Sequence, residues 1–145
     1  MTTLDDLISQ DLTRIRSACA VIMESRDRAF LKDLSESLKQ IKKATKGLNL
    51  GGALCPNSYH VDFAIKKLEF VRKYDDCLCA LYSENMFFNP TDEQEENRLK
   101  INETVHIESK WVDYYLCECT QCQSTFKVEE REGHYMWWSW KIVEK

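Results

Sequence analysis

The residues of this chain that are best suited to metal binding or redox chemistry are cysteines that lie close together in the sequence. Cys119 and Cys122 form a Cys-x-x-Cys turn between two aromatic segments, as in one half of a zinc ribbon. No second Cys-x-x-Cys follows it, but Cys117-x-Cys119-x-x-Cys122 could hold zinc through thiolates. Cys77-x-Cys79 lies upstream, and it or Cys117 could supply the remaining sulfur ligands of a tetrahedral site. A zinc site is therefore one interpretation of the cysteine pattern.

Strand alternation supports a different interpretation of the same cysteines. It places Cys117 and Cys119 on one side of a strand, and free cysteine is among the most buried residue types. A redox role for Cys119 and Cys122 would need the first thiol at a helix N-terminus, whereas strand residues flank it here. A chain of 145 residues can also bury a sufficient hydrophobic core without a disulfide or a bound metal to stabilise it. We therefore predict no cofactor, and a metal that is absent or dispensable.

Acid and base groups are present, but no catalytic set can be assembled from them. His106 falls among polar positions of an alternating segment and His134 lies in or beside a turn, so solvated structural roles are expected for both. The carboxylates of residues 92–96 and 129–132 lack the ligand spacing of a calcium loop. The sequence predicts that this protein is not an enzyme.

Composition indicates an acidic globular protein with reduced thiols. The net charge is −4, from 24 acidic and 20 basic side chains, which gives no general attraction to nucleic acid and a mild one to cationic proteins. The seven cysteines are an odd number, which argues against a disulfide framework. With no basic leader at residues 1–6 and no run of 18 uncharged apolar residues, we expect a cytoplasmic protein that has no contact with membranes.

The first half of the chain has helical periodicity. Apolar residues recur every three or four positions over residues 3–24, and again until Gly47, which predicts two antiparallel helices. One unbroken helix over 3–46 is the alternative. A Gly- and Pro-containing connection at 48–58 then precedes a third helix that begins at Ser58.

The second half changes to a period of two. Cys77 to Tyr82 is a short strand candidate, and the acidic run 92–96 is predicted to be an exposed loop or one helical turn. Alternation over 99–107, which Glu103 interrupts, predicts a half-buried strand. Three further strands are predicted at about 111–119, 123–130 and 135–143, and their short connections make neighbours antiparallel.

These elements define the predicted architecture. The fold class is α+β, with an N-terminal helical hairpin and a third helix packed on a C-terminal antiparallel β-meander. We predict a single domain over residues 1–145, with a helical half at about 1–74 and a mixed half at about 75–145.

The tryptophans of the last strand suggest one buried and one exposed face. Alternation puts Met136, Trp138, Trp140 and Ile142 on the face expected to be core, and Trp137 on the other. An exposed aromatic beside acids suits a protein-binding surface better than a nucleic-acid one.

Residues 111–141 carry an aromatic strand, a Cys-x-x-Cys turn, a second aromatic strand and a Trp-rich strand. This pattern resembles small bacterial proteins encoded beside polymorphic toxins, including the immunity proteins of contact-dependent growth inhibition systems. The resemblance implies a cytosolic antidote that binds one toxin domain, often a nuclease, and blocks its active site or substrate access. A zinc-ribbon-like regulatory module that acts through nucleic acid or a larger complex is the alternative.

The expected partner is thus a cationic toxin domain, met through an acidic surface that bears an aromatic anchor. Charge complementarity of this kind speeds association. The residues predicted to form that surface are Glu93, Glu95, Glu96, Glu129, Glu130 and Trp137.

Overall fold

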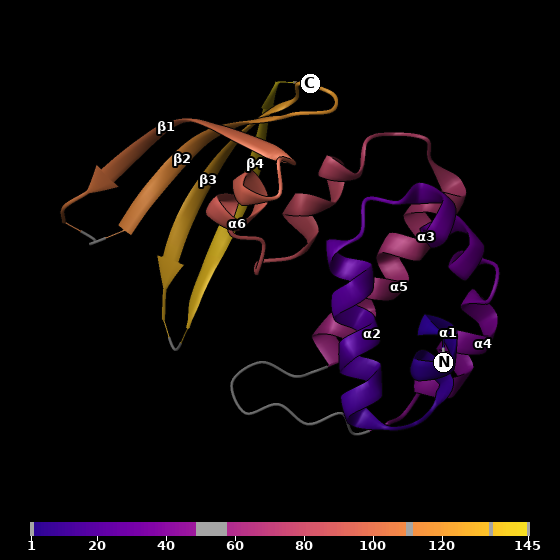
Figure 1. Cartoon of the computed structure of the whole chain (residues 1–145). Coiled ribbons are helices and arrows are strands. Elements are labelled where there is room, and N and C mark those ends of the chain that lie inside the picture. The colour runs from indigo at the N-terminus through magenta and orange to yellow at the C-terminus, as the bar shows by residue number, and fades with distance from the viewer. Residues whose placement is uncertain (1, 49–57, 110–111, 134, 145) are drawn as a thin grey trace. The chain divides into compact units, whose positions relative to one another are not determined.

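The computed structural model describes residues 2–48, 58–109, 112–133 and 135–144 (Figure 1). Helices come first and a four-stranded antiparallel sheet follows, so the predicted α+β class is confirmed. The chain divides into two compact units, which we call the helical unit (Met1–Asp75) and the β unit (Asp76–Lys145). The division falls next to the boundary predicted between the helical half and the mixed half. The number of domains and the packing of helices on the sheet stay predictions, and most of the connection at 48–58 lies outside the described residues.

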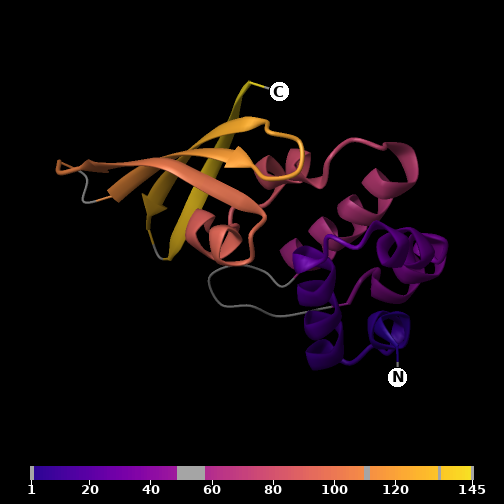
Figure 2. The same cartoon turned by 45° about the horizontal axis from the view of Figure 1, so that its top comes forward.

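The helical unit contains shorter helices than the sequence predicts. They are α1 (Thr3–Ile8), α2 (Leu12–Glu24), α3 (Arg28–Ser35), α4 (Leu38–Thr45) and α5 (Ser58–Lys73). In Figure 2 they form the part of the ribbon coloured from indigo to magenta, in which α5 contacts α2, α3 and α4 while α1 contacts α2 and α4.

The predicted helix over residues 3–24 is interrupted, because its polar residues cap helix ends. Gln10 has a φ of 62°, which an α-helix cannot contain. The Asp11 side chain accepts the backbone N–H of Arg14 at 3.1 Å and so starts α2. The second predicted helix is likewise divided at Glu36 and Ser37. Both the simple hairpin and the single long helix are therefore wrong in detail.

Apolar packing holds the helical unit together. Its most buried side chains come from every helix, and they are Leu7, Ile15, Ile22, Leu31, Ile41 and Leu68. Lys67 is also buried, and its ammonium donates to the backbone carbonyls of Met23 and Ser25 at 2.9 and 2.7 Å. The lysine thereby satisfies carbonyls at the C-terminal end of α2.

Within the described ranges, every helix is too short or too polar to cross a membrane.

The β unit contains two short helices and then the sheet. Its elements are the 3-10 helix η1 (Leu78–Glu84), α6 (Pro90–Glu95), β1 (Leu99–Ile107), β2 (Val112–Cys119), β3 (Thr125–Glu132) and β4 (Met136–Glu144). The strands pair in the order β1-β2-β3-β4, all antiparallel, and α6 lies beside β1 (Figure 1). The meander is confirmed. A register shift between Ile101 and Glu103 accounts for the interruption in the alternating pattern.

The predicted strand from Cys77 to Tyr82 is wrong, because this segment forms η1. Its buried residues are Leu78, Cys79, Leu81 and Tyr82, a spacing of three that a 3-10 helix places on one side. Short apolar runs of this length do not distinguish a strand from a helical turn by periodicity alone.

The core of the β unit is aromatic. The Tyr82 ring stacks on Trp140 with centroids 4.2 Å apart, and both rings meet Phe126 edge to face. The Trp140 indole N–H donates to the carbonyl of Phe88 at 3.0 Å. This cluster joins η1 to the middle of β3 and β4.

The predicted core face of β4 is only partly correct. Trp140 is buried, whereas Trp138 is half-buried and Met136 and Ile142 are exposed. The packing contacts from Tyr82 and Phe88 reach Trp140. Alternation identifies which residues share a face of the strand. How many of those residues are buried depends on the element that packs against that face.

Candidate metal centre and acidic hollow

The fold brings together four cysteines that are far apart in the sequence. Cys77 precedes η1 and Cys79 lies inside it, while Cys119 ends β2 and Cys122 lies in the turn before β3. Their four sulfur atoms all lie within 4.8 Å of one another. The Cys77 and Cys119 sulfurs are 3.7 Å apart, and those of Cys79 and Cys122 are 3.4 Å apart. We call this group the four-cysteine cluster.

A tight turn between β2 and β3 positions Cys119 and Cys122. The N–H of Cys119 donates to the carbonyl of Ser124 at 2.8 Å, and the N–H of Gln123 donates to the carbonyl of Cys119 at 2.9 Å. Gln123 has a φ of 63°, which lets the chain reverse within a few residues. The N–H of Thr120 also donates to the carbonyl of Arg98, at 3.2 Å, so the turn is tied to the start of β1.

The thiols of the cluster differ in environment. Cys79 and Cys119 are buried, Cys77 is half-buried and Cys122 lies at the surface. Burial raises the pKa of Cys77 and of Cys79 above the ordinary thiol value. For Cys122, burial also opposes ionisation, but hydrogen bonding with the side chain and backbone of Ser124 outweighs it and lowers the pKa to about 7.

Cys117 lies on the same face of β2 as Cys119 but stands outside the cluster. It is 1% exposed, and burial raises its pKa to about 12. The expectation that strand cysteines are packing residues therefore describes Cys117, whereas Cys119 faces three other thiols. Cys19 is buried in the helical unit, and Cys55 lies outside the described residues.

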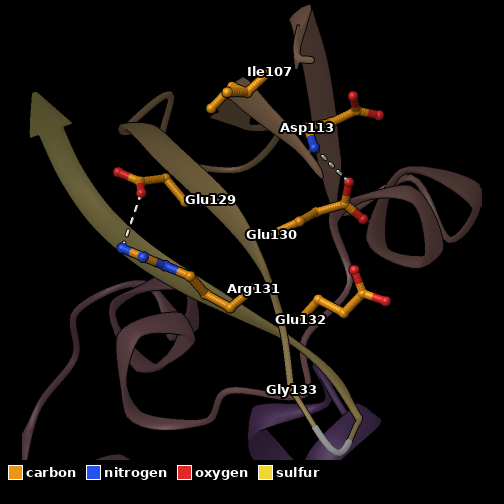
Figure 3. A pocket seen from close by; sticks show the side chains of 7 residues that line it. All are labelled: Ile107, Asp113, Glu129, Glu130, Arg131, Glu132 and Gly133. Atoms are coloured by element: carbon orange, nitrogen blue, oxygen red, sulfur yellow. Dashed lines mark hydrogen bonds and ion pairs between the residues drawn. The ribbon is translucent and has the colours of Figure 1, made fainter. Parts of the chain in front are cut away.

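A second feature lies at the other end of the sheet. A hollow of about 560 Å³ is lined by Ile107, Asp113, Glu129, Glu130, Arg131, Glu132 and Gly133. In Figure 3, Glu129 and Arg131 extend from one side of β3, and Glu130 and Glu132 extend from the other. The lining holds four carboxylates and one guanidinium. We call this feature the acidic hollow.

Hydrogen bonds fix part of the acidic hollow. Glu129 pairs with Arg131 at 3.0 Å, and Glu130 accepts the backbone N–H of Asp113 at 3.0 Å. The pKa of Tyr115 is raised to about 12, first by burial and then by the negative charges of Glu130 and Asp113.

The predicted partner-binding residues fall in several places. Glu129 and Glu130 line the acidic hollow, Glu95 and Glu96 are exposed at the end of α6, and Trp137 is half-buried on β4 opposite Arg131. The remaining charged residues of the hollow, Asp113, Arg131 and Glu132, were not predicted as part of the partner-binding surface. The pairing of β3 with β2 and with β4 brings these residues together. A correct prediction of the strand registers from the sequence could have placed them in one site.

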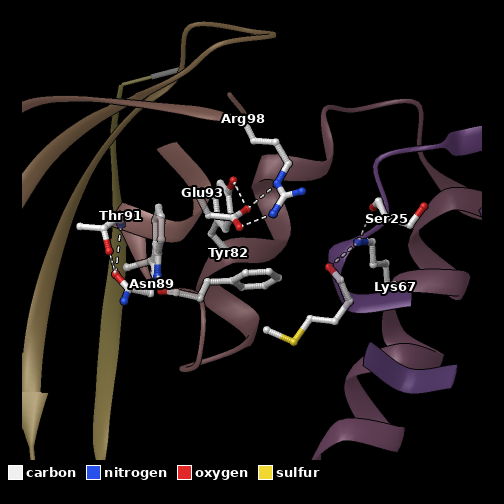
Figure 4. A network of polar contacts seen from close by, with 10 residues as sticks. Ser25, Lys67, Tyr82, Asn89, Thr91, Glu93 and Arg98 are labelled. Atoms are coloured by element: carbon white, nitrogen blue, oxygen red, sulfur yellow. Dashed lines mark hydrogen bonds and ion pairs between the residues drawn. The ribbon is translucent and has the colours of Figure 1, made fainter. Parts of the chain in front are cut away.

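Glu93 must be withdrawn from the predicted surface. It is 5% exposed, accepts the phenol of Tyr82 at 2.7 Å, and forms an ion pair with Arg98 at 2.6 Å (Figure 4). The helical periodicity of α6 turns this one acid of the run inward. Asn89 caps the same helix by accepting the N–H of Thr91 at 3.1 Å.

Within the described part of the β unit, His106 does not pair with the four-cysteine cluster. His106 lies 2.7 Å from Asp113 near the far end of the β1–β2 ladder, whereas Cys119 pairs with Leu99 at the opposite end. His60 belongs to α5 in the helical unit, and His134 lies outside the described residues. The prediction of a non-enzymatic protein stays a prediction.

No protein-family model, curated protein or solved structure matches this chain.

Proposed function

We propose that this protein binds a cationic protein partner through the acidic hollow of its β unit and thereby acts as an antidote to a bacterial toxin domain. The observation that carries the proposal is the concentration of carboxylates at one end of the sheet, in a concave site whose single guanidinium is already paired with Glu129. Concave sites of complementary charge steer an oppositely charged protein toward productive encounter.

The charge of the whole chain is distributed in a way that supports this proposal. Residues 76–145 carry 14 Asp and Glu side chains against seven Lys and Arg, a net −7, whereas residues 1–75 carry 10 against 13, a net +3. The β unit is therefore much more acidic than the net −4 of the chain suggests. Such a unit repels nucleic-acid phosphates and attracts basic proteins.

The hollow combines fixed and available carboxylates. Glu130 is held by the backbone of Asp113, so its position costs little entropy when a partner binds. Glu132 is exposed at the end of β3, where a cationic side chain can approach it. Trp137 lies in register with Arg131, on the side of the sheet that carries Glu129, and would supply an amphipathic anchor beside that carboxylate.

The resemblance of residues 111–141 to immunity proteins supports the toxin as the kind of partner. Nuclease toxins bind a polyanion and are commonly basic, so an acidic surface that covers their substrate site would block access. The antidote needs no catalytic group of its own.

The first experiment measures association with the toxin domain encoded beside this gene. We expect Glu132→Lys to slow association at low salt several-fold and to weaken its salt dependence, because charge acts mainly on encounter. Glu144→Lys is the matched control, since it makes the same charge change at the opposite end of the β3–β4 ladder. Equal effects of the two substitutions would contradict a role for the hollow.

Two further arms extend that experiment. Glu95→Lys with Glu96→Lys tests the exposed end of α6 in the same assay. Trp137→Ala should speed dissociation and cost about 2 kcal/mol or more of binding free energy if the indole is an anchor. In cells, production of this protein should prevent killing by the neighbouring toxin, and a lack of protection would overturn the antidote function.

The alternative of a zinc-ribbon-like regulatory module is favoured by one specific observation, the four-cysteine cluster. A module that acts through nucleic acid should bind DNA or RNA with an affinity that falls as salt rises. The net −7 of residues 76–145 argues against such binding. Measurable, salt-dependent affinity for nucleic acid would favour this alternative over the antidote.

A further inference from the structure

We propose that Cys77, Cys79, Cys119 and Cys122 bind one Zn²⁺ ion as a closed structural centre that ties η1 to the turn between β2 and β3. The inference is independent of the proposed toxin partner. It concerns how the β unit is held together.

The sulfur positions match a tetrahedral site. A Zn–S distance of about 2.3 Å at tetrahedral angles separates neighbouring sulfurs by about 3.8 Å. The two closest pairs measured here are 3.4 and 3.7 Å apart, and all four atoms fall within 4.8 Å. A small adjustment would bring each sulfur to the distance that the ion requires.

A backbone N–H group points at one sulfur of the four-cysteine cluster. The N–H of Gln121 donates to the Cys119 sulfur at 3.4 Å. A centre of four thiolates and one Zn²⁺ carries a formal charge of −2, and N–H donors stabilise negative charge on sulfur. This contact suits Cys119 to metal binding.

The ligand set also defines the role of the metal. Four protein ligands leave no open position for water or substrate, which is the pattern of structural rather than catalytic zinc. Binding exchanges four S–H bonds for four Zn–S bonds and releases the protons to solvent, with no change of oxidation state. A sulfur-only tetrahedral set suits Zn²⁺, and iron is the competing metal.

Disulfides offer a different use of the same cysteines, but their geometry is not present. A disulfide requires sulfurs about 2.05 Å apart, well below the separations of 3.4 and 3.7 Å. All six cysteines of the described chain are free thiols. Each of the four sulfur atoms also lies within 4.8 Å of the other three, as the ligands of one shared ion must.

The test measures metal content in the full chain purified under reducing conditions without chelator. We expect one zinc per chain by elemental analysis and native mass spectrometry. Cys119→Ala should lose the zinc, whereas Cys117→Ala should retain it, because these two buried cysteines lie two residues apart on β2 and only Cys119 belongs to the cluster. Cys19→Ala in the helical unit is a second control and should also retain one zinc.

A second measurement keeps the test decisive if Cys119→Ala does not fold. The metal-free wild-type chain is titrated with Co²⁺, which should give thiolate charge-transfer and tetrahedral d–d absorption that saturates at one equivalent and disappears on addition of Zn²⁺. Metal-free protein that binds neither ion, or a purified chain with disulfides among these cysteines, would overturn the proposal. Stoichiometric iron in place of zinc would overturn the identity of the ion.

Discussion

The helical unit and the β unit are similar in length but are stabilised in different ways. In the helical unit, buried aliphatic side chains come from every helix, and the polar contacts satisfy helix ends, as Lys67 does for α2 (Figure 4). In the β unit, an aromatic cluster around Tyr82 and Trp140 covers the middle of the sheet, and the four-cysteine cluster lies at the end of β2. The proposed zinc ion would add a cross-link between η1 and the turn before β3 to this aromatic packing.

The largest expected effect comes from removing the metal. We expect a strong zinc chelator under reducing conditions to unfold the β unit while the helical unit stays folded, because the cluster belongs to the β unit alone. All four tryptophans lie between residues 111 and 140, so their fluorescence reports the β unit, whereas ellipticity at helical wavelengths reports mainly the helical unit. Excess zinc should restore the fluorescence.

Other outcomes of chelation would change the comparison. If both signals are lost together, the two units depend on one another. If neither signal changes although zinc is removed, the metal is dispensable and the aromatic cluster alone holds the sheet.

Trp140→Ala should be the most costly single substitution among the β4 tryptophans. It removes a buried indole that stacks on Tyr82 and donates to Phe88, so we expect a loss of about 3–5 kcal/mol in the free energy of unfolding. Trp138→Ala should cost about 1–2 kcal/mol, because that side chain is half-buried. Urea unfolding of both variants gives the comparison, and equal costs would place Trp138 in the core.

Leu68→Ala provides the corresponding change in the helical unit. Leu68 is 0% exposed on α5, so the substitution should cost about 2–5 kcal/mol in the unfolding free energy of this unit. Zinc content should remain unchanged. A loss of zinc in this variant would show that the β unit needs the helical unit for its own fold.

Glu93→Gln should have a smaller effect, confined to the β unit. The substitution removes the charge that pairs with Arg98 but keeps an acceptor for Tyr82, so a loss of about 1–3 kcal/mol is expected. Glu96→Gln on the exposed end of α6 is the control and should change stability by less than about 0.5 kcal/mol. Similar values for the two variants would mean that Glu93 is not buried in solution.

The smallest expected effect is a pH dependence of the helical unit. Burial, and secondarily the charge of Arg16, lower the pKa of His60 below its ordinary value of 6.5. As the pH falls through 6.5, the unfolded chain takes up a proton before the folded chain does, so stability declines from that pH down to the folded-state pKa. The urea midpoint of the helical ellipticity should fall slightly in this range. His60→Gln should remove that slope.

Local patterns predicted most of the fold. The alternation from residue 99 onward predicts all four strands within two residues of their ends, and the interruption at Glu103 coincides with a register shift. These predictions hold because the side-chain period of a strand is set by the backbone itself. The helix interruption at Gln10 was missed, since capping by the single polar residue Asp11 competes with a continuous apolar stripe. The interruption at Ser37 was also missed, and there the side chain makes no capping hydrogen bond that could have indicated it.

The sequence by itself therefore determined the α+β class, the antiparallel meander and the position of the cysteine turn. Only the tertiary structure decided which cysteines meet, because Cys77 and Cys119 are 42 residues apart and their contact depends on where η1 packs. It also decided that Glu93 lies inside while Glu95 stays outside, and that Trp140 rather than Trp138 is fully covered. Local spacing sets the direction of a side chain, whereas burial and ligand sets depend on segments brought together by the fold.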